Sequence, residues 1–316
     1  MTIRSHGYRE LTGATAWLNT EPLHPADLRG QVVLVQFWTF TCINWLRTAP
    51  YVRAWSHAYR DDGLVVVGVH TPEFSFEHDL ARVRGAARER GIDYPIAVDS
   101  SYQVWNDFEN QYWPALYFLD REGRVRDHHF GEGRYPQSEH TLQQLLGIDR
   151  PLVQVVGEDV EAEADWAHLR TPETYLGAAR GERLPHGTRT GPGHELGFEM
   201  PAGLRSNQWA LDGSWEIGAE KVVLNRGTGT VAIRFHARDA HLVIARRTAS
   251  PLPFRVSLDH EPPGSSHGAD VDRAGHGTVG DSRLYQLVRQ HGPVRERTLE
   301  ITFLAPGAEA YAFTFG

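Results

Sequence analysis

Residues 37–50, FWTFTCINWLRTAP, contain the single cysteine of this chain of 316 residues. Cys42 follows an apolar run that predicts a strand and precedes a segment that predicts a helix. A sulfur at the N-terminus of a helix faces unpaired backbone N–H groups and the positive end of the helix dipole, which favours the thiolate. This position indicates a nucleophilic thiol that exchanges with disulfides. The other interpretation is a small buried residue, the commonest state of a lone cysteine.

Trp45 stands three residues after Cys42, where the second thiol of a two-cysteine redox site would usually lie. Because the chain has one cysteine, it can form no internal disulfide, and any exchange must proceed through a mixed disulfide with a partner. Trp45 lies on the same side of the predicted helix as Cys42. Its indole either covers the thiol or stacks with a substrate, or it fills the space behind the helix.

Several polar residues lie at or near the ends of predicted strands of the first half, where loops commonly form sites. They are His70, Glu73, His128, His129 and Glu132. As neighbours of the thiol these residues would tune its acidity. The other interpretation is that they are solvated residues of loops or of an exposed strand face.

The elements that would position these side chains follow from hydrophobic periodicity in the first half. Strands are predicted over 32–38, 64–70 and 94–98. Helices are predicted over 43–59, 76–90, 102–109 and 137–146. The stretch ALYFLDREGRVRDHHF, 115–130, predicts a hairpin. Strands separated by helical crossovers imply a parallel core sheet to which the hairpin adds an antiparallel edge, so we expect an α/β domain with a central mixed sheet flanked by helices.

The second half has a different pattern, with short alternating runs separated by Gly, Pro and Asp from about residue 207. About eight strands without helices predict an all-β sandwich of jelly-roll type. The passage LPHGTRTGPGHELGFEMPAG, 184–203, predicts a connector. The expected organisation is an α/β domain over 1–150, connecting segments over 151–205, and a β-sandwich over 206–316.

The order of these motifs resembles a known family. The strand, WTFTC, a helix containing Pro50 and the Trp113-Pro114 pair before ALYFLD resemble the thioredoxin fold. FWTFTCINWLRT, VVGVHTPEF, YWPALYFLDREGRV and HHFGEGRY resemble the redoxin domain of DipZ-type, TlpA-like proteins. PETYLG and AYAFTFG resemble the carbohydrate-binding-module-like domain that follows this redoxin domain, so the resemblance covers nearly the whole chain.

The resemblance implies that Cys42 is the attacking thiol and that Trp45 replaces the resolving cysteine of the family's CxxC motif. It also implies a cis peptide bond before Pro114, beside the thiol, with the backbone before it open to an extended substrate. Gln36 stands where thioredoxins carry a buried acid that helps to deprotonate the resolving thiol. Supporting or substrate-binding roles are accordingly predicted for Thr39, Thr41, Asn44, Trp45, Glu73, Trp113 and Pro114.

These features favour thiol-disulfide exchange through Cys42 alone, with a disulfide-bearing or glutathionylated protein, or a small thiol, as partner. One alternative is a catalytically degenerate redoxin that binds a protein or glycan. Another is a one-cysteine peroxidase, because Thr39 and Cys42 spell the TxxC of peroxiredoxins. Against the peroxidase, residues 34–37 lack the upstream proline of such sites, and Trp113-Pro114 stands where a peroxiredoxin needs arginine.

The second half offers two weaker candidate sites. Trp209 and Trp215 would form a sugar-stacking face or belong to the core, where strand aromatic residues more often lie. A polar loop contains His267, Asp270, Asp272 and His276, whose spacing matches no metal site, so no metal is predicted. The chain also has no phosphate-binding glycine motif, and no cofactor is predicted.

Charge and hydropathy exclude other classes of partner. The net charge of -8 is spread evenly, with 15 basic and 19 acidic residues in 1–150 and 17 and 21 in the remainder. Without a basic patch, neither nucleic acid nor a membrane surface is an expected partner. The apolar runs are too short to span a bilayer, residues 1–17 do not resemble a signal peptide, and folding needs no oxidising compartment, so we expect a cytoplasmic protein.

Overall fold

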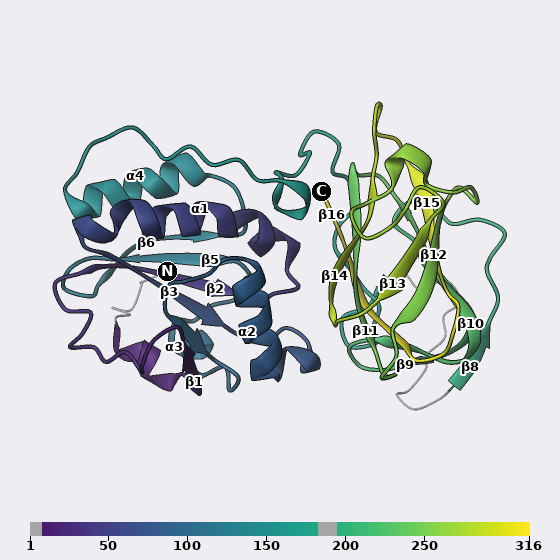
Figure 1. Cartoon of the computed structure of the whole chain (residues 1–316), viewed down its shortest axis with the longest axis horizontal. Coiled ribbons are helices and arrows are strands. Elements are labelled where there is room, and N and C mark those ends of the chain that lie inside the picture. The colour runs from purple at the N-terminus through teal and green to yellow at the C-terminus, as the bar shows by residue number, and fades with distance from the viewer. Residues whose placement is uncertain (1–7, 183–194) are drawn as a thin grey trace. The chain divides into compact units, whose positions relative to one another are not determined.

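A computed structural model describes residues 8–182 and 195–316 of the chain (Figure 1). The chain divides into two compact units, the first ending at Ala162 and the second running from Glu163 to Gly316. This boundary lies inside the predicted connecting segment, 151–205. Residues 184–194 of the predicted connector lie outside the described residues. Among the helices of the described part, none combines the length and the apolar character that crossing a membrane requires.

The first unit is built on a six-stranded mixed sheet with the order β1-β4-β3-β2-β5-β6. Its strands are β1 (Ala16–Leu18), β2 (Val32–Trp38), β3 (Leu64–His70), β4 (Ile96–Val98), β5 (Ala115–Leu119) and β6 (Val125–Phe130). β2, β3 and β4 run parallel, whereas β1, β5 and β6 pair in the antiparallel sense. The predicted mixed sheet with a closing antiparallel hairpin is confirmed.

Helices cover this sheet on both faces. α1 (Ile43–Tyr59) and α4 (Tyr135–Leu146) lie along one face, and α3 (Gln103–Asp107) lies on the other (Figure 1). On the α3 face, Val35 and Phe37 of β2 join one hydrophobic cluster with Val104 and Phe108. Every residue of β2 is buried, because a strand covered on both faces has no solvent side.

The helix predicted over 76–90 is divided into two elements. The 3-10 helix η3 (Ser75–His78) ends before Asp79, and α2 (Leu80–Glu89) begins after it. Asp79 has an extended backbone, and its carboxylate accepts a hydrogen bond from the N–H of Ala81 at 2.8 Å. An aspartate in this position caps a new helix, so the single amphipathic helix of the sequence prediction is wrong.

The chain beyond α4 stays attached to the first unit through buried and half-buried polar contacts. Glu139 of α4 accepts hydrogen bonds from Trp55 Nε1 at 2.9 Å and from the N–H of Val153 at 2.7 Å. Farther on, Glu161 in the 3-10 helix η4 (Asp159–Glu161) binds both terminal nitrogens of Arg53 at 3.1 Å. These contacts explain why the first unit extends to residue 162.

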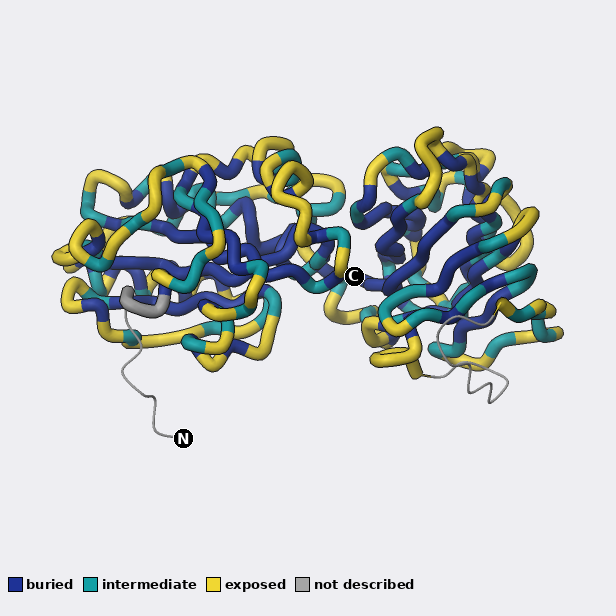
Figure 2. The backbone as a smooth tube through the Cα atoms, turned by 90° about the horizontal axis from the view of Figure 1, so that it is seen from below, coloured by how far each residue is buried: buried dark blue, intermediate teal, exposed yellow. Residues whose placement is uncertain are grey.

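In its described residues, 163–182 and 195–316, the second unit contains strands and one 3-10 helix, η5 (Gly264–Ser266), so its predicted all-β character is confirmed. The strands are β7 (Thr174–Tyr175), β8 (Glu195–Phe198), β9 (Trp209–Ile217), β10 (Val222–Phe235), β11 (Asp239–Arg246), β12 (Leu252–Leu258), β13 (His276–Val279), β14 (Arg283–Arg289), β15 (Arg297–Phe303) and β16 (Ala308–Phe315). They form one connected sheet, whose main path is β13-β12-β15-β10-β16-β11-β14. Figure 2 shows the strands of both units as mostly buried and the turns as exposed.

β10 joins two halves of this sheet. Its Val222 pairs with Ala310 of β16, whereas Thr230 pairs with Thr302 of β15. β9 follows β10 through both halves, with shifts of register between them. At this bend Gly213 has φ +103°, and a Cβ there would lie 2.9 Å from the carbonyl oxygen of Thr228. Glycine is therefore required for the two strands to pass from one half to the other.

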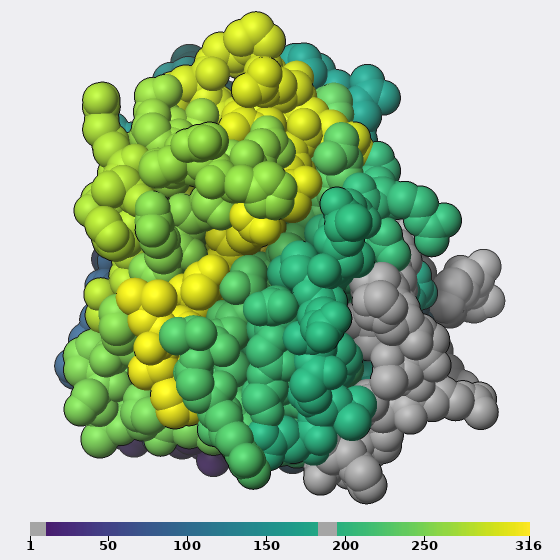
Figure 3. Space-filling model, turned by 90° about the vertical axis from the view of Figure 1, so that its right-hand side faces the viewer, coloured from purple at the N-terminus to yellow at the C-terminus, as the bar shows by residue number. Residues whose placement is uncertain are grey.

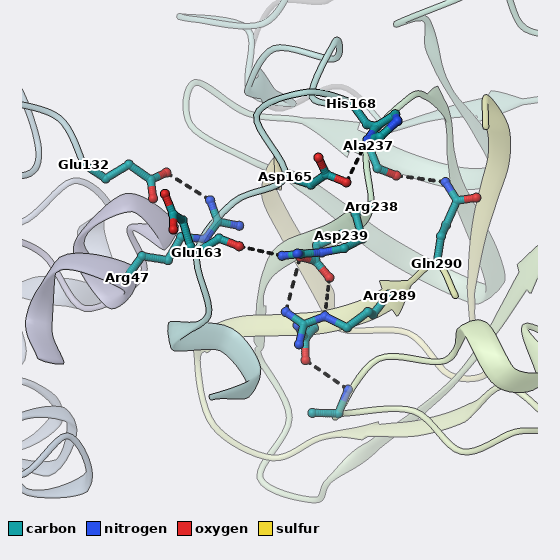
Figure 4. Close-up of polar contacts among 12 residues, drawn as sticks. Arg47, Glu132, Glu163, Asp165, His168, Ala237, Arg238, Asp239, Arg289 and Gln290 are labelled. Atoms are coloured by element: carbon teal, nitrogen blue, oxygen red, sulfur yellow. Dashed lines mark hydrogen bonds and ion pairs between the residues drawn. The ribbon is translucent and has the colours of Figure 1, made fainter. Parts of the chain in front are cut away.

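β16 is the last strand of the sequence, but it lies between β10 and β11 in the sheet. On the face shown in Figure 3, this last part of the chain, in yellow, runs between earlier segments in green. Asp239, at the start of β11, is fully buried and holds β16 through a backbone hydrogen bond to Gly316 O at 2.6 Å. Its carboxylate accepts hydrogen bonds from Nε of Arg289 at 2.6 Å and of Arg238 at 3.0 Å (Figure 4).

Candidate active site

Cys42 holds the N-cap position of α1, directly after the loop that follows β2. Its N–H donates to the carbonyl of Thr39 at 3.3 Å, and its carbonyl accepts from the N–H of Leu46 at 3.0 Å. The side chain is half-buried, and Sγ lies 3.6 Å from the carbonyl oxygen of Trp113. The thiol donates a hydrogen bond to this carbonyl, which favours its protonated form, whereas the positive end of the α1 dipole favours the thiolate.

The Trp113 carbonyl belongs to the loop that precedes β5. The Trp113-Pro114 peptide bond is cis, which confirms the prediction for this bond. Trp113 itself is half-buried: its indole lies against Trp105 with ring centroids 4.3 Å apart, and its Nε1 donates to the carbonyl of Thr71 at 3.1 Å. The loop that carries Pro114 is therefore attached to the segment that follows β3.

Aromatic rings form the floor of the site behind α1. Trp45 is fully buried and stacks on Trp38, with ring centroids 4.5 Å apart. Trp38 also contacts His70, whose complete burial lowers its pKa to about 3 and keeps its ring neutral. Trp45 thus fills the space behind the helix and offers no surface on which a substrate could stack.

Gln36 lies on β2 under this floor. It is fully buried, and its side-chain carbonyl accepts a hydrogen bond from the hydroxyl of Tyr94 at 3.0 Å. Burial raises the pKa of Tyr94, so the phenol stays protonated and remains the donor. A neutral amide–phenol pair therefore lies at position 36, where the resemblance implies that thioredoxins carry a buried acid.

The polar candidates on and after β6 make contacts of their own. Glu132 forms an ion pair with Arg47 of α1 at 3.0 Å, and both side chains are almost fully buried (Figure 4). The ring of His128 lies 4.7 Å from that of Phe130 on the edge strand β6. Burial lowers the pKa of His129. Glu132 thus holds its loop against the helix that carries the thiol.

Sequence reasoning missed Glu77, the buried carboxylate that contacts the thiol loop (residues 39–42, between β2 and α1), and pointed to Glu73 instead. Glu77 Oε1 accepts hydrogen bonds from Thr41 Oγ1 at 2.7 Å and from the Thr41 N–H at 3.3 Å. Its Oε2 accepts from the N–H groups of Glu73 at 2.6 Å and Phe74 at 2.9 Å. Burial, together with the charge of Glu73, raises the pKa of Glu77 to about 7, although the hydrogen bonds it accepts oppose this shift.

The remaining predicted site residues lie between β2 and α1, on the first turn of α1, and in the segment that follows β3. Thr39 is buried, and its carbonyl accepts the N–H of Cys42. Asn44 is half-buried, and its carbonyl accepts the hydroxyl of Thr48 at 2.8 Å. Glu73 is half-buried, and its N–H reaches Glu77. Through Glu77 and the 71–77 loop, the structure brings Thr41, Cys42, Trp113 and Glu73 into one connected site.

The candidate sites of the second unit form no comparable arrangement. Trp209 and Trp215 belong to the hydrophobic core and are 1% and 0% exposed, so they cannot form a sugar-stacking face. Asp270 binds the guanidinium of Arg283, and Asp272 closes a turn onto the N–H of His276 at 2.8 Å. Across residues 8–182 and 195–316, no group of three or more His, Cys, Asp or Glu side chains could hold a metal ion.

Comparison with known proteins adds two family matches. Residues 14–128 match the AhpC/TSA family, and residues 171–316 match a family described as thioredoxin like C-terminal domain. The thiol-disulfide oxidoreductase YkuV of Bacillus subtilis is 36% identical over 124 residues, which cover 39% of this chain and 82% of YkuV. A thioredoxin-like protein, solved in solution in its oxidized form, is 33% identical and covers 46% of this chain and 98% of its own, with a TM-score of 0.43.

A longer relative matches both units in part. Protein DipZ of Mycobacterium bovis is 38% identical over 240 residues, which cover 74% of this chain but 34% of DipZ. The chain thus spans about a third of the length of this relative. The match to YkuV, in contrast, covers most of that protein but only 39% of this chain.

Proposed function

Because this chain belongs to the thioredoxin-like AhpC/TSA redoxin family, we propose that it is a thiol-disulfide oxidoreductase that works through the single thiol of Cys42. The position of Cys42 carries this proposal: a half-buried sulfur at the N-cap of α1, 3.6 Å from the carbonyl of Trp113. An inert cysteine of the core would be fully buried among apolar side chains instead.

The proposed reaction has two steps. The Cys42 thiolate attacks one sulfur of a partner's disulfide, a new S–S bond forms between them, and the second sulfur of the partner leaves as a thiolate. An external thiolate then attacks the partner's sulfur in this mixed disulfide, forms a new S–S bond with that sulfur and displaces Cys42 as a thiolate. The partner is a disulfide-bearing or glutathionylated protein, or a small disulfide.

An external thiol is needed because Trp45 occupies the place of the family's resolving cysteine. Its indole is fully buried against Trp38, so the site behind α1 is filled rather than open for a second thiol. A monothiol cycle therefore depends on a compartment that supplies reduced thiols, and we propose a cytoplasmic location on that ground.

For the second unit we propose a β-sandwich of jelly-roll type, related to carbohydrate-binding modules. The passage of β9 and β10 through both halves of the sheet supports two packed layers. The proposed ligand of this unit is a protein or a glycan, and a glycan would have to stack on residues other than the buried Trp209 and Trp215. If the thiol is inactive, this binding function becomes the leading proposal for the whole chain.

The reactivity of Cys42 tests the proposal. We expect iodoacetamide to alkylate the native protein at pH 7 at least tenfold faster than an unstructured peptide of residues 37–47, because the helix N-terminus favours the thiolate and a tenfold change requires only about 1.4 kcal/mol. Oxidised glutathione should give one mixed disulfide per chain by mass spectrometry. Cys42→Ser provides the matched control.

Slow alkylation, at or below the rate of the peptide, would reject a functional thiol. Efficient turnover of insulin by the pure protein with dithiothreitol, at rates typical of dithiol redoxins, would also contradict the monothiol cycle. Rapid reduction of hydrogen peroxide by Cys42, with no exchange on glutathione disulfide, would favour the one-cysteine peroxidase instead.

A further inference from the structure

We propose that Glu77 is a positioning residue for Cys42, with a carboxylate that ties the thiol loop at Thr41 to the loop formed by residues 71–77. This inference rests on the proposed function, because it concerns how the same thiol is presented. Glu77 is remote in sequence from Thr41, and both side chains are buried.

One carboxylate oxygen of Glu77, Oε1, contacts the thiol loop. Thr41 directs its hydroxyl and its N–H at Oε1, at 2.7 and 3.3 Å. Thr41 directly precedes Cys42, which is the N-cap of α1. Two bonds to one oxygen fix both the backbone and the side chain of Thr41, so they fix the residue through which the chain enters the helix.

The other oxygen, Oε2, contacts the 71–77 loop. Oε2 accepts the N–H groups of Glu73 and Phe74, at 2.6 and 2.9 Å. The same loop accepts Trp113 Nε1 at the carbonyl of Thr71, at 3.1 Å. The carboxylate thus connects the segment before the thiol to the segment that holds the Trp113 carbonyl beside Sγ.

A cap of η3 alone would not need this arrangement. A glutamate at this helix position ordinarily reaches back to the N–H groups at the start of its own helix, which is what Oε2 does. That role leaves the other oxygen in water, whereas Glu77 is 1% exposed and its other oxygen lies on Thr41. The contact with the thiol loop is therefore additional to capping.

All four contacts require an acceptor. The ionised carboxylate offers enough lone pairs for four donors, but a protonated carboxyl turns one oxygen into a donor and loses at least one contact. The titratable groups around Glu77 are Glu73 on its own loop, Cys42 on the thiol loop and the exposed His78 next in sequence. His70 at the end of β3 stays neutral, since burial lowers its pKa to about 3.

Protonation of Glu77 near neutral pH should therefore change the thiol loop. Because burial raises the pKa of Glu77 to about 7, the carboxylate form dominates at pH 8 and the protonated form at pH 6. The loss of one contact at Thr41 or at the 71–77 loop should slow the reaction of the thiolate, even after correction for the fraction of thiolate present.

The amide resonance of Thr41 provides a direct test in the full chain. In Cys42→Ser, which removes the thiol titration, we expect the Thr41 amide shift to titrate with a midpoint of about 7. Adding Glu77→Gln should abolish this transition. Adding Glu139→Gln should preserve it, because Glu139 is a buried carboxylate of the same unit that contacts Trp55 and Val153 instead.

Alkylation of the native thiol gives the functional readout. The thiolate fraction is measured by absorbance at 240 nm, and the iodoacetamide rate is divided by it. In wild-type protein we expect this corrected rate to rise about five-fold from pH 6 to pH 8, the equivalent of one hydrogen bond of about 1 kcal/mol. In Glu77→Gln this ratio should be flat. In Glu77→Asp, which keeps the charge but shortens the side chain, it should keep its transition at a lower rate.

An unchanged Thr41 amide shift between pH 5 and 9 in Cys42→Ser would overturn the inference without relying on a Glu77 variant that fails to fold. Identical corrected alkylation profiles for wild type and Glu77→Gln would likewise reduce Glu77 to a structural cap. The two proposals remain distinguishable. If glutathione disulfide does not react with Cys42, the proposed function fails, while the Thr41 titration still decides the role of Glu77.

Discussion

Glu77 in the first unit and Asp239 in the second are both buried carboxylates, but different donors face them. Glu77 accepts hydrogen bonds from backbone N–H groups and the hydroxyl of Thr41. Asp239 binds the guanidinium groups of Arg238 and Arg289. Burial raises the pKa of Glu77, whereas for Asp239 burial is outweighed by the two cations and the pKa is lowered.

A second pair of residues repeats this contrast. Asp99 in the first unit accepts the N–H of Val104 at 3.0 Å and the hydroxyl of Thr71 at 3.2 Å, and burial raises its pKa. For Glu309 in the second unit burial is outweighed by Lys221 and Arg247, so its pKa is lowered. Neutral donors leave a buried carboxylate able to take up a proton, whereas cations hold it ionised. The two carboxylates with raised pKa accept hydrogen bonds from Thr41, next to the thiol, and from Thr71, which holds Trp113.

We expect the largest effect from a variant that breaks the ion pairs of Asp239 with Arg238 and Arg289 in the second unit. Asp239→Asn leaves two guanidinium groups without their carboxylate and weakens the contact that holds β16, and we expect a loss of about 3 kcal/mol. Native-state hydrogen exchange of peptides from β11, β14 and β16 should then be roughly 100-fold faster.

The exposed Glu199→Gln serves as the control for this variant and should leave the same peptides within about 0.5 kcal/mol of wild type. Equal protection of β16 in Asp239→Asn and wild type would show that the cations do not stabilise this strand through Asp239.

An effect of similar size concerns the pH dependence of the first unit. Between the ordinary glutamate pKa of 4.5 and about 7, the folded protein keeps a proton on Glu77 that the unfolded chain releases. The free energy of unfolding should therefore fall as pH rises through this window, by on the order of 3 kcal/mol. Above the window this contribution is constant.

Urea unfolding between pH 4.5 and pH 8, followed by hydrogen exchange of β2 and β3 peptides, measures this slope. Glu77→Gln should lower stability and remove the Glu77 part of the slope, whereas Glu139→Gln should lower stability and keep it. A slope that is the same in Glu77→Gln and wild type would contradict a titrating Glu77.

The smallest expected effect comes from a variant that removes one cation from a buried carboxylate of the second unit. Lys221→Met removes an ion pair of 2.9 Å with Glu309, which keeps its contact with Arg247. Because Lys221 is partly exposed and one cation remains, we expect a loss of about 1 kcal/mol, measured by urea unfolding. Arg226→Met, which breaks a highly exposed pair with Glu195, should give no measurable change. A larger loss for Arg226→Met than for Lys221→Met would contradict the importance of burial.

Local patterns predicted much of the first unit. The runs 32–38 and 64–70 became β2 and β3 with the predicted bounds, and α1 spans the predicted 43–59, because continuous apolar strands and a long helix are strong signals. For the second half the pattern predicted short runs separated by Gly, Pro and Asp, and residues 226–229 of β10 include two such glycines. In the structure a bend with shifted register carries the strand through them.

The candidate site was harder to predict because its contacts join distant segments. Cys42 could be found from its place between a strand and a helix. Glu77 stands three residues after Phe74, a spacing that can indicate a glutamate that caps its own helix. Its contact with Thr41, however, joins residues far apart in the chain, which no local pattern predicts. Trp45 was left with two interpretations, and only the stacking on Trp38 distinguished them.

The place of β16 in the sheet has a consequence for the order in which the protein is made. The first unit ends at Ala162 and can complete its sheet while the ribosome is still translating the second. In the second unit β10 and β11 must wait for β16, which is translated after every other strand of that sheet and lies between them. Until then the edges of β10 and β11 that pair with β16 stay open, and open strand edges promote aggregation, so the nascent second unit is vulnerable until β16 has been made.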